Sequence, residues 1–186
     1  GLVGKYVDYK DAYKSVDEAL IHGGLENDTN VNIVRIESHK LNKKNIKKYL
    51  KNINGILIPG GFGLRGTEGK ILAIKYARLN TIPFFGICFG MQMAVIEAAR
   101  NMLNIKNASS SEFGNNCTPV VGLIEEWQKG KKIFKGSEKD LGGTMRLGLY
   151  DAIIKNNSLI SKIYSEKRIK ERHRLSSEVN IIYKRE

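Results

Sequence analysis

The sequence has 186 residues, a formal net charge of +12, and 41% hydrophobic and 27% charged residues. This length and composition are typical of one globular domain that buries most of its apolar surface. No apolar run approaches the roughly 20 residues that span a bilayer, and residues 1–14 lack the features of a signal peptide. We therefore expect a cytoplasmic protein without membrane contact, although a domain cut from a longer chain would also lack its own targeting signal.

The cysteine and histidine patterns exclude two further classes of protein. Cys88 and Cys117 are the only two cysteines, which is too few for a disulfide framework. No CxxC or HxxxH spacing offers a metal site. We expect no metal and no other cofactor in this domain.

Much of the positive charge falls in a lysine-rich segment, residues 42–53. Its apolar residues recur at helical spacing, which indicates a surface helix with one buried stripe. They are Ile46, Tyr49, Leu50 and Ile53, with Lys43, Lys44, Lys47, Lys48 and Lys51 between them. The basic residues lack the set of interleaved aromatics found on nucleic-acid surfaces, so we expect no nucleic-acid partner. Anionic ligands such as nucleotides are compatible with the charge.

In chain order, the first half of the sequence alternates between strands and helices. We expect strands at 2–7, 31–36, 55–61 and 82–88, and helices at 11–24, 42–53, 70–80 and 91–103. Ser15 and Glu18 have capping-box spacing, and Gly23–Gly24 would end the first helix. After about residue 104 we expect a strand within 119–127, a hairpin or lid within 129–150, a helix at 158–165, a charged segment at 169–180 and a final strand at 180–186.

Apolar strands that alternate with helices indicate an α/β fold. Such strands lie in an open, mostly parallel, flavodoxin-like sheet with helices on both faces. Ligands of these folds gather at the carboxyl ends of the strands. Two glycine-rich turns fall at such ends, one after Ile58 and one around Cys88.

The sequence GICFG, Gly86 to Gly90, places a cysteine at a strand-to-helix turn. It is the cysteine counterpart of the GxSxG nucleophile elbow, in which the glycines let strand and helix pack closely. The helix N-terminus would favour the thiolate of Cys88, and free backbone N–H groups such as that of Phe89 could stabilise an oxyanion. The alternative is a buried, inert core cysteine, which is the interpretation we give to Cys117.

Six segments extend the resemblance from the elbow to nearly the whole chain. The elbow resembles that of class I (triad-type) glutamine amidotransferases. The six segments resemble, in order, the amidotransferase domain of the CTP synthase family; they are GKYVDYKDAYKSVDEAL, GILIPGGFGLRGTEGKILAIKYAR, IPFFGICFGMQMAVIEAARN, NASSSEF, DLGGTMRLG and ERHR. The resemblance implies one amidotransferase domain at residues 1–186, incomplete at its C-terminal end. Nothing resembles the family's amidoligase domain, and there is no GxxxxGK[ST] phosphate loop.

The resemblance implies that Cys88 attacks the side-chain amide of L-glutamine and forms a glutamyl thioester. The backbone N–H groups of Gly61 and Phe89 would form the oxyanion hole; most relatives have leucine at the Phe89 position. The implied glutamine-binding residues are Gly61, Phe89, Gly90, Met91, Gln92, Glu112 and Arg174. Without the resemblance, Gln92 would be interpreted as exposed on the first helical turn and Glu112 as a solvated loop charge.

The resemblance also implies the partners of the whole enzyme. Ammonia would pass to an amidoligase domain, where ATP with magnesium activates UTP and ammonia converts it to CTP. GTP would promote glutamine hydrolysis, and a homo-tetramer is expected. Phe62 and Arg146 could take part in the GTP response, although glycine-loop packing and a surface charge explain them equally well.

The sequence departs from the family pattern at the catalytic base. A thiol nucleophile needs a base, which in this family is the histidine of a His-Pro-Glu segment. None of His22, His39 and His173 precedes a proline. We expect His22 at a helix C-terminus and His39 in a charged turn. The base would lie beyond Glu186 or be lost, and in the second case the chain would be a catalytically incomplete regulatory or assembly module.

A second departure lies in the segment ERHRLSSEVN. Ser176 stands where the family has an arginine that holds the substrate carboxylate, and Ser177 where it has a tyrosine. The natural sequence could differ here, it could have been altered, or missing residues could bring unrelated segments together. Arg174 could substitute for the lost arginine.

Overall fold

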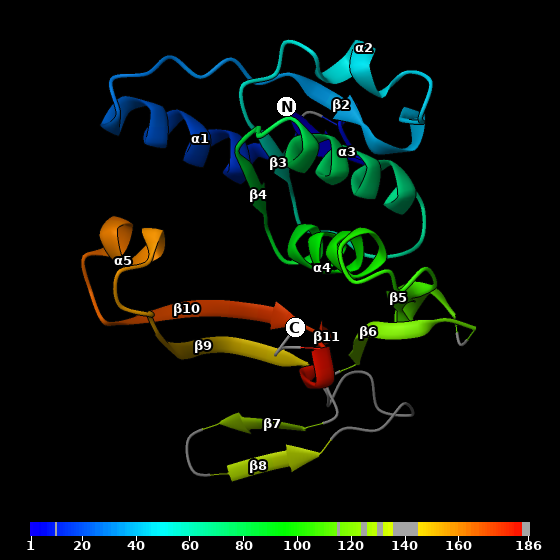
Figure 1. The fold of residues 1–186 in the computed structure, drawn as a ribbon. Helices are drawn as coiled ribbons and strands as arrows, with labels where there is room; N and C mark the ends of the chain where they lie inside the picture. Colours follow the sequence, from blue (N-terminus) through cyan, green and yellow to red (C-terminus); the bar gives the residue numbers. More distant parts are fainter. Residues whose placement is uncertain (10, 115, 124–125, 130–131, 136–144, 184–186) are drawn as a thin grey trace. The chain divides into compact units, whose positions relative to one another are not determined.

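The computed structural model describes residues 1–9, 11–114, 116–123, 126–129, 132–135 and 145–183 (Figure 1). The chain divides into two compact units. The first unit comprises Gly1–Val121 and Val179–Glu186, and the second comprises Gly122–Glu178.

A four-stranded parallel sheet forms the centre of the first unit (Figure 1). The strands β1 (Leu2–Gly4), β2 (Arg35–Glu37), β3 (Ile56–Ile58) and β4 (Phe84–Gly86) lie in the order β2-β1-β3-β4. Strand order reverses between β1 and β3, which is the switch point where ligands of doubly wound folds bind. The loops after β1, β3 and β4 therefore share one edge of the sheet.

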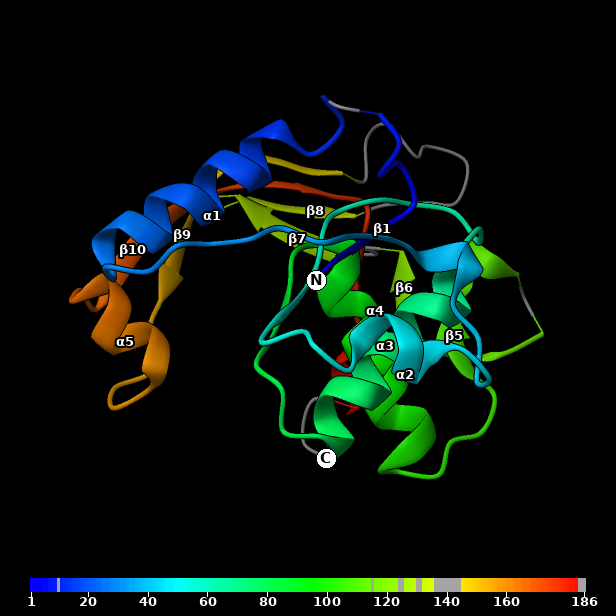
Figure 2. The same cartoon turned by 90° about the horizontal axis from the view of Figure 1, so that it is seen from above.

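Helices cover the two faces of this sheet. They are α1 (Lys14–Glu26), α2 (Ile46–Leu50), α3 (Thr67–Leu79) and α4 (Phe89–Asn101). Successive strand residues point to opposite faces: Val3 and Ile58 join the core with α3 and α4, whereas Leu2 and Leu57 pack against Tyr13 beside α1. Figure 2 shows α1 on one side of β1 and the other three helices on the other side. The expected α/β class is confirmed.

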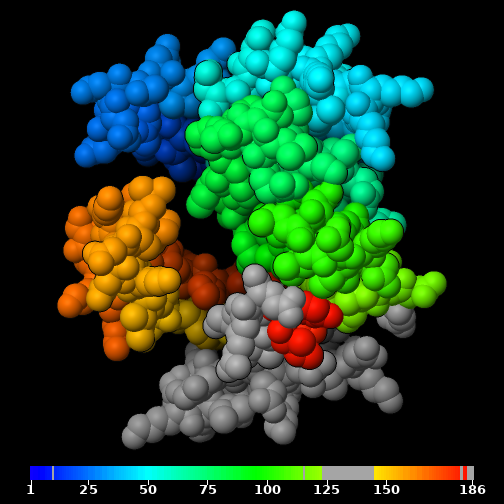
Figure 3. Space-filling model, viewed as in Figure 1, coloured from blue at the N-terminus to red at the C-terminus, as the bar shows by residue number. Residues whose placement is uncertain are grey.

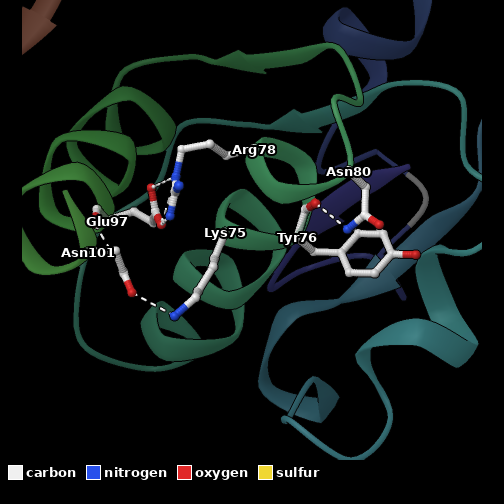
Figure 4. Close-up of polar contacts among 6 residues, drawn as sticks. All are labelled: Lys75, Tyr76, Arg78, Asn80, Glu97 and Asn101. Carbon is white, nitrogen blue, oxygen red and sulfur yellow. Dashed lines mark hydrogen bonds and ion pairs between the residues drawn. The ribbon is translucent and has the colours of Figure 1, made fainter.

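Helices α3 and α4 are joined by a polar contact as well as by the core (Figure 4). The Glu97 side chain accepts hydrogen bonds from the Arg78 guanidinium at 2.7 and 3.1 Å, although Glu97 itself is only 1% exposed. On the same helices, the ammonium of Lys75 donates to Asn101 Oδ1 at 2.7 Å. Both contacts lie between α3, which follows the β3 loop, and α4, which begins at Phe89.

The lysine-rich segment lies at the surface, as expected. The segment around α2 is the cyan region of Figure 3, and its lysines are exposed while Leu50 is fully buried. The 3₁₀ turn η1 (Ser38–Lys40) precedes it. Tyr49, which was expected in the buried stripe, is exposed. The helix is also shorter than expected, with only five residues.

A small three-stranded sheet follows α4. Strand β5 (Ala108–Ser110) pairs in parallel with β6 (Thr118–Leu123), and the 3₁₀ turn η2 (Ser111–Phe113) lies between them. The sheet order is β11-β6-β5, with β11 at Ser177–Val179. The chain then forms the 3₁₀ turn η3 (Ile181–Tyr183).

The second unit is built from antiparallel strands. Strands β7 (Glu126–Lys129) and β8 (Lys132–Lys135) pair with each other. Strands β9 (Arg146–Ile153) and β10 (Arg168–Leu175) pair from Arg168↔Ile153 to Leu175↔Arg146, and α5 (Leu159–Tyr164) connects them. Part of the predicted hairpin or lid, residues 136–144, lies outside the described residues.

Several predicted boundaries were wrong. Helix α1 runs through Gly23–Gly24 to Glu26, and its N-cap is Tyr13, not Ser15. Gly24 does not end the helix. Glycine is needed there because the Thr29 backbone packs closely against it: a Cβ at Gly24 would lie 2.5 Å from the Thr29 carbonyl oxygen. The predicted final strand is the 3₁₀ turn η3, the strand predicted at 31–36 forms only from Arg35, and the charged segment contains strand β10.

Candidate active site

The loop around Cys88 has the geometry of a nucleophile elbow. Cys88 follows β4 and is the N-cap of α4, with backbone angles φ 54° and ψ −105°. A positive φ is uncommon for a residue with a side chain and is typical of strained functional sites. The elbow predicted at the strand-to-helix turn is confirmed.

The glycines that flank the elbow are required by space. A Cβ atom at Gly86 would lie 2.6 Å from the carbonyl carbon of Gly90. A Cβ atom at Gly90 would lie 2.1 Å from the carbonyl oxygen of Ile58 in β3. Strand β4, helix α4 and strand β3 therefore meet at distances that only glycine allows.

The pKa of the half-buried Cys88 thiol is raised above its usual value. Burial is the main cause, and the Glu112 carboxylate raises the pKa further. The backbone N–H of Phe89, at the start of α4, donates toward the sulfur and lowers the pKa. The helix N-terminus thus acts in the expected direction, toward the thiolate, but burial outweighs it and the net pKa is raised.

The two residues implied as oxyanion donors lie on the elbow and on the neighbouring loop after β3. Gly61 follows β3 and Phe89 follows Cys88 in the chain. A Cβ at Gly60 would lie 3.7 Å from the Cys88 Cβ, and a Cβ at Gly61 would lie 3.9 Å from the Phe89 ring. The β3 loop and the elbow therefore lie next to each other, as two donors from these segments would need in order to serve one oxyanion.

The implied glutamine-binding residues fall into two groups. Gly61, Phe89, Gly90, Met91, Gln92 and Glu112 all belong to the first unit, and Arg174 lies on β10 of the second unit. Gln92 is 4% exposed, so the interpretation of an exposed helical residue is wrong. The roles of these residues in binding glutamine stay predictions.

Glu112 lies against the loop after β3. Its carboxylate accepts a hydrogen bond from the Gly63 backbone N–H at 2.5 Å, and its own N–H donates to Ser110 Oγ at 3.2 Å. Glu112 is exposed, as a solvated loop charge would be, but its carboxylate is also bound to the loop after β3. Its effect on the pKa of Cys88 also places its charge close to the thiol.

Among the described residues, the three histidines lie on other elements: His22 in α1, His39 in η1 and His173 in β10. His22 lies within α1, which has no basic residue in its last turn, so the predicted helix-dipole role is wrong. The His39 ring lies 3.4 Å from the Glu37 carboxylate. The His173 ring stacks on Tyr150, with 5.1 Å between centroids. In the described part of the chain, no histidine forms a hydrogen bond with Cys88.

The residues considered for the GTP response lie in different units. Phe62 is exposed, and its carbonyl oxygen accepts a hydrogen bond from the Lys5 ammonium at 2.5 Å. Arg146 pairs with Glu178 at 3.4 Å and lies over the Tyr150 ring.

The second cysteine, Cys117, was expected to be inert. Its thiol donates to the carbonyl oxygens of Gly114 and Ser110.

One residue of this region was missed by the sequence analysis. Lys70, in the first turn of α3, is 1% exposed, and its ammonium lies 4.6 Å from the centroid of the Phe89 ring. A lysine at the start of an amphipathic helix is normally solvated. The available signal was its position five residues after the arginine of the glycine loop, GLRGTEGK, in the first turn of the helix that follows that loop.

Metal clusters and membrane-spanning helices are both absent from the described ranges. No group of three or more His, Cys, Asp or Glu side chains there could hold a metal ion. No helix in those ranges is long and apolar enough to cross a membrane.

Comparison with known proteins identifies the family. The family model for class I glutamine amidotransferases matches residues 8–184. The CTP synthase of Pelagibacter ubique is 67% identical over 183 residues, which cover 98% of this chain and 34% of that protein. The CTP synthases of Brucella anthropi and Agrobacterium fabrum are 58% and 56% identical over 184 residues, with the same coverage. The chain thus spans about one third of the length of these curated relatives.

A solved structure gives the same result. The glutaminase domain of Trypanosoma brucei CTPS, with bound acivicin, superposes with a TM-score of 0.83 at 36% identity, covering 98% of this chain and 68% of that chain. The resemblance to the amidotransferase domain of CTP synthases is confirmed. The chain therefore belongs to the class I glutamine amidotransferase family.

Proposed function

We propose that this chain hydrolyses L-glutamine to glutamate and ammonia, with Cys88 as the nucleophile. The observation that carries the proposal is the elbow: a thiol held at a positive φ, with the Phe89 N–H directed at its sulfur and the Gly61 loop against it. This combines a nucleophile at the carboxyl edge of the sheet with backbone donors for acyl transfer.

The reaction has two halves. The Cys88 sulfur attacks the side-chain amide carbon, and negative charge develops on the amide oxygen, where the N–H groups of Gly61 and Phe89 bind it. The proton that the thiol gives up passes to the amide nitrogen, the C–N bond breaks, ammonia leaves, and a glutamyl thioester remains. Water attacks this thioester, the C–S bond breaks, and glutamate is released with Cys88 again a thiol.

Glu112 and Gln92 position the substrate in this proposal. The Glu112 carboxylate is close enough to influence Cys88 and would bind the α-ammonium group of glutamine. Gln92 is buried one turn into α4 and would contact the substrate amide end. Arg174 would bind the α-carboxylate, as a substitute for the family arginine that Ser176 replaces.

The ammonia would serve an amidoligase domain. The curated relatives, of which this chain covers 34%, are named CTP synthase, which supports amination of UTP to CTP by the whole enzyme. ATP and magnesium would act in that other domain, GTP would act as an effector, and a homo-tetramer would be the assembly.

A second candidate is a catalytically incomplete regulatory or assembly module of the same fold. It is favoured by the raised pKa of Cys88 and by the absence of a histidine partner for the thiol among the described residues. The two candidates differ in whether a base reaches Cys88 in the working protein.

Ammonia release from L-glutamine distinguishes them. The natural full-length protein is assayed beside Cys88→Ser, with Cys117→Ser as the matched control. Hydrolysis that Cys88→Ser abolishes and Cys117→Ser leaves intact supports the enzyme. No hydrolysis by the folded wild-type protein, with or without GTP, supports the incomplete module.

A further inference from the structure

A buried cation lies against both residues of the oxyanion hole. The Lys70 side chain is 1% exposed, and its ammonium lies 4.6 Å from the centroid of the Phe89 ring. A Cβ atom at Gly61 would lie 3.7 Å from the same ammonium nitrogen. Lys70 therefore supports the loop that carries one proposed donor and the residue that carries the other.

The charge of Lys70 has no acidic partner in the described part of the chain. The ion pairs there join other residues, and the charged neighbours of Lys70 are the cations Lys5 and Arg65. Burial, followed by the charges of Lys5 and Arg65, lowers its pKa to about 8. A buried, unpaired cation is costly to keep, and such groups concentrate at functional sites.

We propose that Lys70 is a positioning residue for the oxyanion hole. Its side chain holds the Gly61 loop and Phe89 together, and its positive charge is compensated only when the substrate amide oxygen becomes negative. The inference rests on the proposed glutaminase function. An interaction that is stronger in the transition state than in the ground state raises kcat rather than lowering KM. A fixed charge that has no partner before the reaction meets this condition.

The titration of Lys70 gives the inference a pH signature. The charged groups that act on Lys70 are Lys5 after β1 and Arg65 before α3. The titratable groups of the elbow and the neighbouring loop are Cys88, the N-cap of α4, and Glu112 of η2, which bonds to the Gly63 N–H. As the pH rises through about 8, Lys70 loses its proton and its contribution disappears. Substitutions at Lys70 leave the titration of the thiol and its base in place, so ratios between variants isolate Lys70.

The test compares Lys70→Met and Lys70→Arg in the natural full-length protein, with Lys75→Met as the control from the same helix. Methionine keeps the length of the side chain without its charge, and arginine keeps the charge at all working pH values. At pH 7, we expect Lys70→Met to lower kcat about 10- to 100-fold with KM changed less than about 3-fold. We expect Lys70→Arg to recover most of kcat, and Lys75→Met to match the wild type.

The pH profile supplies the decisive readout. The ratio of wild-type to Lys70→Met activity should fall as the pH rises from 7 to 9.5, whereas the ratio of Lys70→Arg to Lys70→Met should stay constant. Equal activity of Lys70→Met and wild type, a ratio that does not depend on pH, or failure of arginine to rescue would overturn the inference. If Lys70→Met does not fold, Lys70→Arg is compared with the wild type instead. In that comparison Lys70→Arg must retain its activity above pH 8, where the wild type loses the charge of Lys70.

The two hypotheses fail in different ways. If the wild-type protein releases no ammonia, the proposed function itself is wrong. If the wild-type protein is active, Cys88→Ser is inactive and the Lys70 variants match the wild type, the function stands and only the role of Lys70 is wrong.

Discussion

The Glu112 carboxylate accepts a hydrogen bond from the backbone N–H of Gly63 at 2.5 Å. This bond joins the proposed binding site for the substrate ammonium group to the loop that carries Gly61. The same carboxylate raises the pKa of Cys88. One negative charge thus contacts the loop after β3 and raises the pKa of the thiol, and in the proposed function it also binds the substrate ammonium group.

Replacing Glu112 by glutamine should separate these effects. The glutamine carbonyl can still accept the Gly63 hydrogen bond, but the negative charge is lost. We expect the pKa of Cys88 to fall, because the charge that opposed the thiolate is gone, and KM for glutamine to rise about 10- to 100-fold, because the substrate ammonium loses a charged partner. The rate of iodoacetamide alkylation against pH, resolved by peptide mass spectrometry, measures the thiol.

Glu68→Gln is the matched control for Glu112→Gln. Glu68 is an exposed carboxylate paired with Arg100 at 2.8 Å, and its loss should change neither the thiol pKa nor KM. An unchanged or raised Cys88 pKa in Glu112→Gln would show that the carboxylate does not act on the thiol as argued.

Gly90→Ala should damage the fold at the elbow. The added methyl group would lie 2.1 Å from the Ile58 carbonyl oxygen, so β3 and α4 must move apart. We expect a loss of about 3 kcal/mol or more in the free energy of unfolding. At the exposed Gly23 of α1, an added methyl group would have no atom within 4 Å, and Gly23→Ala should stabilise by about 0.5–1 kcal/mol. Thermal unfolding of both variants measures the difference, and equal effects would refute the steric argument.

The pair of Arg78 and Glu97 should show unequal single substitutions. Arg78→Met leaves the Glu97 carboxylate buried without its partner, with 2% of its side chain exposed, and should cost about 3 kcal/mol. Glu97→Met leaves an arginine with 35% of its side chain exposed, which water can solvate, and should cost about 1 kcal/mol. Urea unfolding of the two single variants and the double variant tests this: the double variant should be more stable than Arg78→Met, and additive losses would contradict the pairing.

Lys70→Met should stabilise the protein while it lowers activity. The pKa of Lys70 is lowered from 10.5 to about 8 in the folded protein, so between these values the unfolded chain binds more protons and wild-type stability rises with pH. Below pH 8 the cost of the buried charge is fully present. We expect Lys70→Met to exceed the wild type by about 1–3 kcal/mol at pH 7, and the difference to shrink as the pH approaches 10.5. A less stable Lys70→Met at pH 7 would contradict this cost.

The elbow could be predicted because its constraints are local. A short apolar strand, a cysteine between two glycines and a helical repeat specify one turn, and the contacts of Gly86 and Gly90 in the structure explain that spacing. The parallel sheet was predictable for the same reason, since β1, β3 and β4 are apolar on both faces.

Features that depend on tertiary contacts were not predictable. Gly24 resembles a helix stop, but it permits close approach of Thr29. Strand β10 (RIKERHRL) consists mostly of charged residues, and its pairing with β9 rather than its composition makes it a strand. The burial of Lys70 depends on Phe89 and Gly61, which lie far from it in sequence or on another element. The net pKa of Cys88 depends on burial, which the helix position alone does not reveal.

The central claim is that Cys88 is the nucleophile for glutamine. The most direct test is incubation of the natural full-length protein with a glutamine-mimicking diazoketone, followed by intact mass and peptide mapping, with excess L-glutamine as the competitor. The account predicts a single adduct on Cys88 that glutamine suppresses. An adduct confined to Cys117, or no adduct on the folded protein, would contradict it.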